Sequence, residues 1–373
     1  MNEEKRFDLW KSVRQLDRRY IWIILALGTL VIRAMSSPAA TEAWYSRGFF
    51  LFFRRAFDFV LGWNPIPIFY ILILWLALWL GSKTYYWWRW RAPLGQKLRS
   101  GALTVVSFLS GVITLFLWMW GFNYGRIPLE QQIEITPKPL SLQELKDEYY
   151  RITDSLALFR APLSDTLALE ELPFDPAALT DTLREDLESV LASLDYPTTG
   201  TIKARRLLPR GVLLRLSTSG VYLPWTGEGH VDAGLHPLQL PFVLAHEMAH
   251  GYGIADEGSC NFLAYLTCYE HPDPFIRYVG CLGYWRYLAS SFRSLDPEAY
   301  KGAYAEIPRG VIADLQSIYR QMDKYPDILP RFRNAFYDSY LKAQGVKEGI
   351  KSYSRILMLV HAWEEKKQET LKK

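Results

Sequence analysis

The chain has 373 residues, of which half are hydrophobic and 15% aromatic, and its formal net charge is only +4. This small charge gives no reason to expect a polyanionic partner, and no motif supports nucleic-acid binding. The 14 tryptophans are many for a soluble protein and are concentrated before residue 125. The length suits a membrane segment followed by one globular domain of about 200 residues.

Three apolar segments predict transmembrane helices at about residues 20–37, 66–81 and 101–121, which makes residues 1–125 a membrane domain. Arg33 lies late in the first segment, which spans a bilayer only if this side chain reaches the far interface. Residues 41–65 mix aromatic side chains with three arginines and predict an amphipathic element at the membrane surface. The lipid bilayer is therefore the first expected partner.

Basic residues set the expected orientation of these helices. Lys and Arg number six in residues 1–19, five in residues 82–100 and three in residues 38–65. The positive-inside rule then places the first two stretches in the cytoplasm and everything after residue 122 outside. We expect a multi-pass protein of the inner membrane with an extracytoplasmic domain.

Residues 126–140 contain three prolines and predict a linker, and residues 141–373 predict a mostly helical α+β domain with a small sheet. Ser141 and Glu144 form a capping-box pattern at the start of its first helix. Two strands are expected at residues 211–217 and 220–225, and Pro224 indicates that the second lies at a sheet edge. Further helices are expected at residues 141–159, 175–194, 275–292, 297–325, 330–344 and 349–363.

His230 and His236 fall in a glycine-rich loop and are expected to be solvated. The three cysteines, Cys260, Cys268 and Cys281, lack metal-ligand spacing, and we expect them to be buried and small rather than bonded to each other.

The motif His246-Glu247-Met248-Ala249-His250 carries the strongest functional signal. On a helix, residues four apart lie on one face, so the two histidines can share one metal ion. Zinc suits two imidazoles and one carboxylate with a fourth position open for water, and Glu247 can then act as the general base. Pro241 before the motif and Gly251 and Gly253 after it predict a helix that ends just beyond His250.

Two acids compete for the third ligand. Glu257 would lie in the first turn of a second helix, where Asn261 shares its face and could hydrogen-bond a ligand histidine. Asp256 instead completes the pattern H-E-x-x-H-x-x-G-x-x-D, which is similar to the metzincin motif with Asp in place of the last histidine. We favour Glu257 on the argument from Asn261.

At these residues the sequence resembles the bacterial membrane-protein family known as domain of unknown function 3810. The resemblance is carried by His246 to His250, Gly253, Glu257 and Asn261-Phe-Leu-Ala-Tyr265, and extends to Tyr337-Asp-Ser-Tyr-Leu-Lys342 and Gly349-Ile-Lys-Ser-Tyr353. It implies a zincin-like, membrane-anchored peptidase type and supports Glu257 as a ligand. Gly251 departs from the family, which usually has Gln there.

The sequence therefore predicts a zinc metallopeptidase of the gluzincin type, in which His246, His250 and Glu257 hold Zn2+ and Glu247 activates water for the cleavage of a protein or peptide near the membrane. One alternative is a metal-binding membrane protein without catalysis, acting as a scaffold or sensor. Intact Glu247 argues against it, because a structural zinc site usually closes with four protein ligands. The other alternative is a membrane interaction protein in which the motif is accidental.

Overall fold

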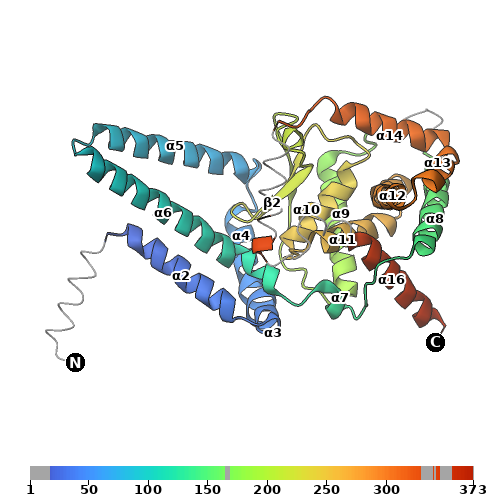
Figure 1. The fold of residues 1–373 in the computed structure, drawn as a ribbon, viewed down its shortest axis with the longest axis horizontal. Helices are drawn as coiled ribbons and strands as arrows, with labels where there is room; N and C mark the ends of the chain where they lie inside the picture. The colour runs from blue at the N-terminus through green and yellow to red at the C-terminus, as the bar shows by residue number, and fades with distance from the viewer. Residues whose placement is uncertain (1–16, 164–168, 329–338, 340–341, 345–354, 373) are drawn as a thin grey trace.

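The computed structural model describes residues 17–163, 169–328, 339, 342–344 and 355–372. It is mostly helical and has two groups of elements, with long helices extending to one side of a compact group that carries the small sheet (Figure 1). The first group, here called the N-terminal helices, comprises α2 (Arg19–Met35), α3 (Pro38–Ala40), the π-helix η1 (Thr41–Phe49), α4 (Phe50–Leu61), α5 (Ile68–Arg89), α6 (Leu94–Met119) and the 3-10 helix η2 (Gly121–Gly125).

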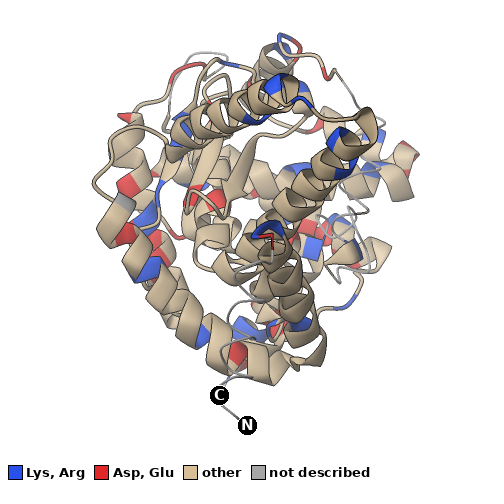
Figure 2. Cartoon of the chain, turned by 90° about the vertical axis from the view of Figure 1, so that its left-hand side faces the viewer, with Lys and Arg blue, Asp and Glu red and all other residues tan. Residues whose placement is uncertain are grey.

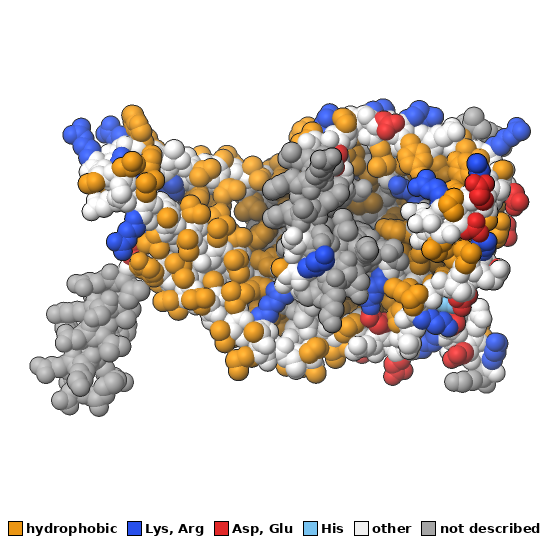
Figure 3. Space-filling view, in the orientation of Figure 1, with side chains coloured by type: hydrophobic (Ala, Val, Ile, Leu, Met, Phe, Trp, Pro, Cys, Tyr) orange, Lys and Arg blue, Asp and Glu red, His pale blue; other side chains and the backbone are white. Residues whose placement is uncertain are grey.

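Helices α5 and α6 are long and apolar enough to cross a membrane. Helix α2 forms a third span only if it is counted together with Pro38–Val60, to which it is bent by 112°. Hydrophobic side chains dominate the visible surface of these helices (Figure 3). Two or three spans are thus consistent with a membrane protein, and α5 and α6 extend beyond the predicted segments, to Arg89 and from Leu94.

The basic ends of the N-terminal helices lie together, away from the compact group. Arg19 at the start of α2 donates hydrogen bonds to the carbonyl and hydroxyl oxygens of Ser100 at 2.9 Å. Figures 2 and 3 show Lys and Arg at this end of the helices. At the opposite end of α2, the guanidinium of Arg33 donates to Gln344 Oε1 at 2.6 Å.

The compact group buries one large hydrophobic core, in which α10 and α11 are central and almost wholly inaccessible to solvent. Its helices are α7 (Leu129–Gln132), α8 (Leu142–Arg160), α9 (Pro176–Ser193), η3 (Leu214–Leu216), α10 (Leu240–Gly251), α11 (Glu257–Tyr269), α12 (Pro274–Leu295), α13 (Pro297–Ala305), α14 (Arg309–Met322) and α16 (Ile356–Leu371). Both bonds of the predicted Ser141–Glu144 capping box are present at the start of α8. The expected helix over 297–325 is divided into α13 and α14, with Pro308 at the cap of the second.

The sheet has three strands in the order β1-β3-β2, where β1 is Ala204–Leu207, β2 is Gly220–Leu223 and β3 is Glu228–Asp232. Strand β1 is parallel to β3 and β2 is antiparallel to it. Because β2 is an outer strand of this order, the prediction of Gly220–Leu223 at an edge is confirmed.

The prediction of a strand at residues 211–217 is wrong. Asp232 accepts hydrogen bonds from the amides of Gly211, Leu213 and Leu214 at 2.7, 2.7 and 3.1 Å, and these bonds hold the segment in turns.

The prediction that His230 and His236 are solvated is also wrong, because the segment after β2 turns back into the sheet. His230 lies on β3 with no exposed surface, and His236 is 4% exposed. Leu238 N donates to Nδ1 of His236, so Nε2 carries its proton and donates to Ser317 Oγ at 3.1 Å. Both histidines are therefore parts of the core.

Residues 126–140, predicted as a linker, contribute Leu129, Ile133 and Ile135 to the main core. Most of the predicted helix 330–344 lies outside the described residues. The predicted helix 349–363 is described from residue 355 onward, where it is helical as the start of α16, which continues to Leu371. Most positions in the two C-terminal stretches that carry the resemblance, and most of the basic stretch 1–19, also lie outside the described residues.

Candidate metal centre

Helix α10 carries both histidines of the motif into the core. It begins with Leu240 and Pro241, where the missing proline N–H costs no helical hydrogen bond, and its residues are apolar apart from His246, Glu247 and His250. The one-turn spacing brings the two imidazoles onto the same face, with ring centroids 4.9 Å apart. The local sequence therefore suffices to pair them.

A tight turn reverses the chain after His250 and starts α11 beside α10. Gly253 has φ +87°, a conformation that residues with a side chain rarely adopt. Asp256 then caps α11, because its carboxylate accepts bonds from the amide and hydroxyl of Ser259, each at 2.7 Å. Its other oxygen lies 3.3 Å from Arg355, and Asp256 thus faces away from the histidines.

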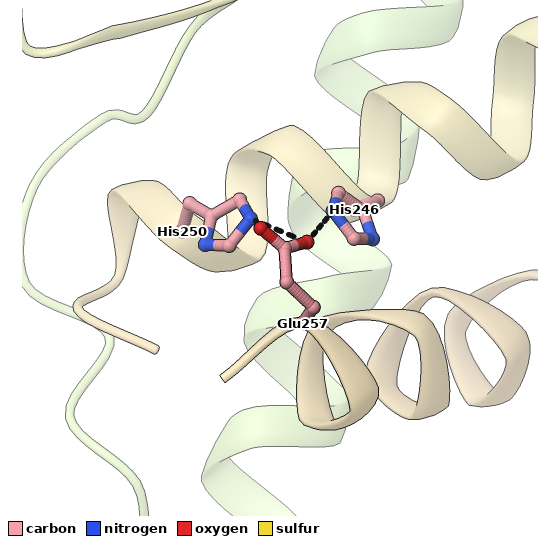
Figure 4. A group of neighbouring side chains, drawn as sticks. All are labelled: His246, His250 and Glu257. Carbon is pink, nitrogen blue, oxygen red and sulfur yellow. Dashed lines mark hydrogen bonds and ion pairs between the residues drawn. The ribbon is translucent and has the colours of Figure 1, made fainter. Parts of the chain in front are cut away.

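Glu257, in contrast, faces both imidazoles (Figure 4). Its Oε2 lies 3.1 Å from Nε2 of His246 and 3.4 Å from Nε2 of His250. Among the described residues these three side chains form the one cluster whose donor atoms all lie within 4.8 Å of one another and could hold a metal ion. Burial alone would raise the pKa of Glu257, but the two histidines hold it well below its ordinary value, which keeps the carboxylate ready to act as a ligand.

The donor set could hold a divalent metal ion. Nδ1 of His250 bonds to the carbonyl of Ile254 at 2.8 Å and also contacts Cys260 Sγ at 3.3 Å. Because Nδ1 donates its proton to that carbonyl, Nε2, on the side of Glu257, is the nitrogen of His250 that could bind a metal ion. Two imidazoles and one carboxylate are a set that zinc binds while keeping one position open.

Glu247 lies against the sheet, beside the cluster. A side chain at Gly220 on β2 would come within 2.6 Å of Glu247 Oε1, and one at Gly229 on β3 within 2.8 Å of Glu247 Cβ, so both glycines make room for it. Its Oε2 is buried and has no hydrogen-bond partner in the described part of the chain. Burial raises the pKa of Glu247 to about 7, although both histidines act to lower it.

Two tyrosines flank the cluster. Tyr287 on α12 lies close to Asn261 and Glu257, and burial raises its pKa to about 12, with the charge of Glu257 acting in the same direction. Tyr222 on β2 lies close to Arg54 and His250, and burial raises its pKa although both positive charges act to lower it. Asn261 and Glu257 are thus both neighbours of Tyr287. The predicted hydrogen bond from Asn261 to a ligand histidine remains a prediction.

Comparison with known proteins identifies the family. The family model described as "Protein of unknown function (DUF3810)" matches residues 45–361. The chain belongs to this family. No curated protein and no solved structure matches the DUF3810 chain.

Gly251, directly after His250, lies against Ile202, whose Cγ2 would be 2.3 Å from an added Cβ. A larger residue at position 251 would therefore require a different packing of residue 202.

Two residues at the centre were not predicted from the sequence. Trp120 donates from its indole to the carbonyl of His250 at 2.7 Å, and the guanidinium of Arg126 donates to the carbonyl of Gly253 at 3.0 Å. The sequence places Trp120 at the end of the third predicted transmembrane segment and Arg126 at the start of the predicted linker. Neither pattern indicates a contact with residues more than 120 positions away.

Proposed function

We propose that the chain is a membrane-anchored, zinc-dependent metallopeptidase with a zincin-like catalytic arrangement. The observation that carries the proposal is the convergence of His246, His250 and Glu257 with the buried, unpaired carboxyl oxygen of Glu247 beside them. A purely structural metal site has no use for that additional carboxyl group. An accidental motif would not be expected to place a third donor from a second helix against both histidines.

Each residue has a defined role in this proposal. His246, His250 and Glu257 would hold zinc, which supplies a Lewis acid for the scissile carbonyl and lowers the pKa of water. Glu247 takes the proton of the attacking water and returns it to the leaving amine. Tyr287 and Tyr222 offer hydroxyl groups at the edge of the cluster for the developing oxyanion.

Strand β2 supports an extended peptide as the substrate. It is an outer strand of the described sheet, and Gly220 at its start contacts Glu247. A peptide that adds to a free strand edge gains main-chain hydrogen bonds and is held with its backbone in line with the catalytic carboxyl group. Tyr222 on this strand packs against Trp120 at the end of α6, with ring centroids 5.6 Å apart, so such a peptide would lie close to the membrane surface.

We place the protein in the inner membrane, with the compact group on the outer face. The basic ends of α2 and α6 lie together, at the opposite end of these helices from the candidate metal centre, as the positive-inside rule requires for this orientation. Protein or peptide segments near the outer membrane surface would then be within reach.

The test combines metal content with hydrolysis by the full chain purified in detergent. We expect about one zinc per chain by elemental analysis, lost in Glu257→Ala and kept in Asp256→Ser, which preserves the helix cap. Glu247→Gln should keep the metal and lose turnover of a peptide library, followed by mass spectrometry, by at least about 100-fold. A Glu247→Gln protein that cleaves at the wild-type rate would rule out the assigned base.

A further inference from the structure

The turn between α10 and α11 connects the two histidines to Glu257. Its carbonyl groups accept hydrogen bonds from residues at the end of the N-terminal helices. Trp120 and Arg126, which follow α6, donate to the carbonyls of His250 and Gly253. Trp120 is 4% exposed and Arg126 is 9% exposed, so both bonds are shielded from water. Neither donor belongs to a helix that carries a ligand.

The guanidinium of Arg126 is itself fixed by a buried carboxylate. Arg126 Nε and Nη2 donate to the two oxygens of Glu42 at 2.8 and 2.6 Å, and the guanidinium lies 4.3 Å from the ring centroid of Tyr196. Glu42 belongs to η1, the π-helix that leads into α4. Burying such a pair costs desolvation free energy and contributes little net stability, but two parallel hydrogen bonds define one geometry.

The apolar surroundings of the turn also come from the N-terminal helices. Ala255 is buried in a small hydrophobic cluster, separate from the main core, whose other buried members are Tyr45, Phe50, Leu117, Trp120 and Phe122. An added Cβ at Gly253 would come within 2.9 Å of Phe50 and 3.2 Å of Asn123. Polar and apolar contacts therefore hold the same turn.

We propose that Trp120, Arg126 and Glu42 are positioning residues of the metal centre, so that its affinity for metal depends on how the N-terminal helices pack. This inference rests on the metal binding assumed in the proposed function. The turn is directly connected to two ligands. The carbonyl of Ile254 in the turn accepts a hydrogen bond from Nδ1 of His250, and Glu257 follows three residues after Ile254. A shift of the turn would move both ligands, and loss of such outer contacts typically weakens metal binding about 10- to 100-fold.

The experiment measures the affinity of the full chain in detergent for Zn2+ and Co2+, by competition with a chelating dye. Trp120→Phe removes the indole donor and keeps an aromatic ring, and Arg126→Lys removes the two-bond contact with Glu42. We expect each to weaken binding about 10- to 100-fold and to change the visible absorption spectrum of the Co2+-saturated protein. Glu42→Gln provides a third test if either variant is poorly folded.

Two matched controls are available within the chain. Trp285 is a buried tryptophan whose indole donates to Thr153 at 2.9 Å, and Arg160 forms a buried pair with Asp314 at 2.7 Å. Trp285→Phe and Arg160→Lys should lower the thermal midpoint of the metal-free protein to a similar extent and leave metal affinity and the Co2+ spectrum unchanged.

The outcomes separate the two proposals. Wild-type affinity and spectrum in Trp120→Phe, Arg126→Lys and Glu42→Gln would overturn the positioning role, even if the protein cleaves peptides. Weakened binding in these variants, with no hydrolysis by the wild type, would support positioning and count against the peptidase. A wild-type chain that binds neither metal would overturn both.

Discussion

At the scale of single residues, the left-handed Gly253 has two reasons to be glycine. Its φ is +87°, and an added Cβ would contact Phe50. We expect Gly253→Ala to destabilise the fold by about 1–2 kcal/mol from the backbone alone, with a further cost from that contact, and to weaken metal binding. Gly302→Ala on α13, where an added Cβ meets nothing within 4 Å, should instead be neutral or stabilising in the same thermal unfolding assay.

His230 predicts a dependence of stability on pH. Burial, together with the charge of Arg205, lowers its pKa to about 4 from an ordinary value near 6.5. Between pH 4 and pH 6.5 this histidine binds a proton in the unfolded chain but not in the folded chain. Its contribution to the free energy of unfolding is therefore fully present above pH 6.5 and is lost as the pH falls toward 4. The contribution is about 3 kcal/mol, because one pKa unit corresponds to about 1.4 kcal/mol.

The measurement is chemical unfolding of the wild type and His230→Phe at several pH values. The phenylalanine retains the ring that contacts Phe69 and cannot titrate. We expect a smaller loss of stability for the variant between pH 6.5 and 4, and identical slopes for the two proteins would contradict the assignment.

At the scale of elements, the start of α8 is fixed by local chemistry. Ser141 Oγ accepts from the amide of Glu144 at 3.3 Å, and Glu144 Oε2 accepts from the amide of Ser141 at 2.7 Å. We expect Ser141→Ala to reduce the free energy of unfolding by about 1 kcal/mol. Ser141→Asp should retain most of this stability, because aspartate also caps helices. A Ser141→Ala variant as stable as the wild type would mean that the cap contributes nothing.

At the scale of the whole molecule, the arrangement predicts opposite outcomes for two C-terminal reporters. The C-terminal helix α16 lies in the compact group, away from the basic ends of the N-terminal helices (Figure 1). With that group outside, alkaline phosphatase fused after residue 373 should be active, and a fluorescent protein that folds only in the cytoplasm should be dark. The reverse pattern would invert the proposed orientation.

Features that depend on short spacing could be predicted without a structure. Residues four apart share a helix face, so His246 and His250 could be paired without a structure, and the glycines after them marked the turn. The capping box of α8 and the apolar lengths of α5 and α6 are equally local. The sequence favoured Glu257 over Asp256 as the third ligand without excluding Asp256, because the two acids are adjacent and their roles differ only in the cap geometry of α11.

Contacts between residues far apart in the chain could not be predicted in this way. Trp120 and Arg126 contact residues 130 and 127 positions away, and no periodicity in the sequence records such a pairing. Three further features also depend on contacts between separate segments of the chain. They are the burial of His230, the turns around Gly211 that Asp232 stabilises, and the packing of residues 126–140 in the core. Burial of the chain favours such contacts, because most buried polar groups are hydrogen-bonded and the partner can come from any segment that the fold brings near.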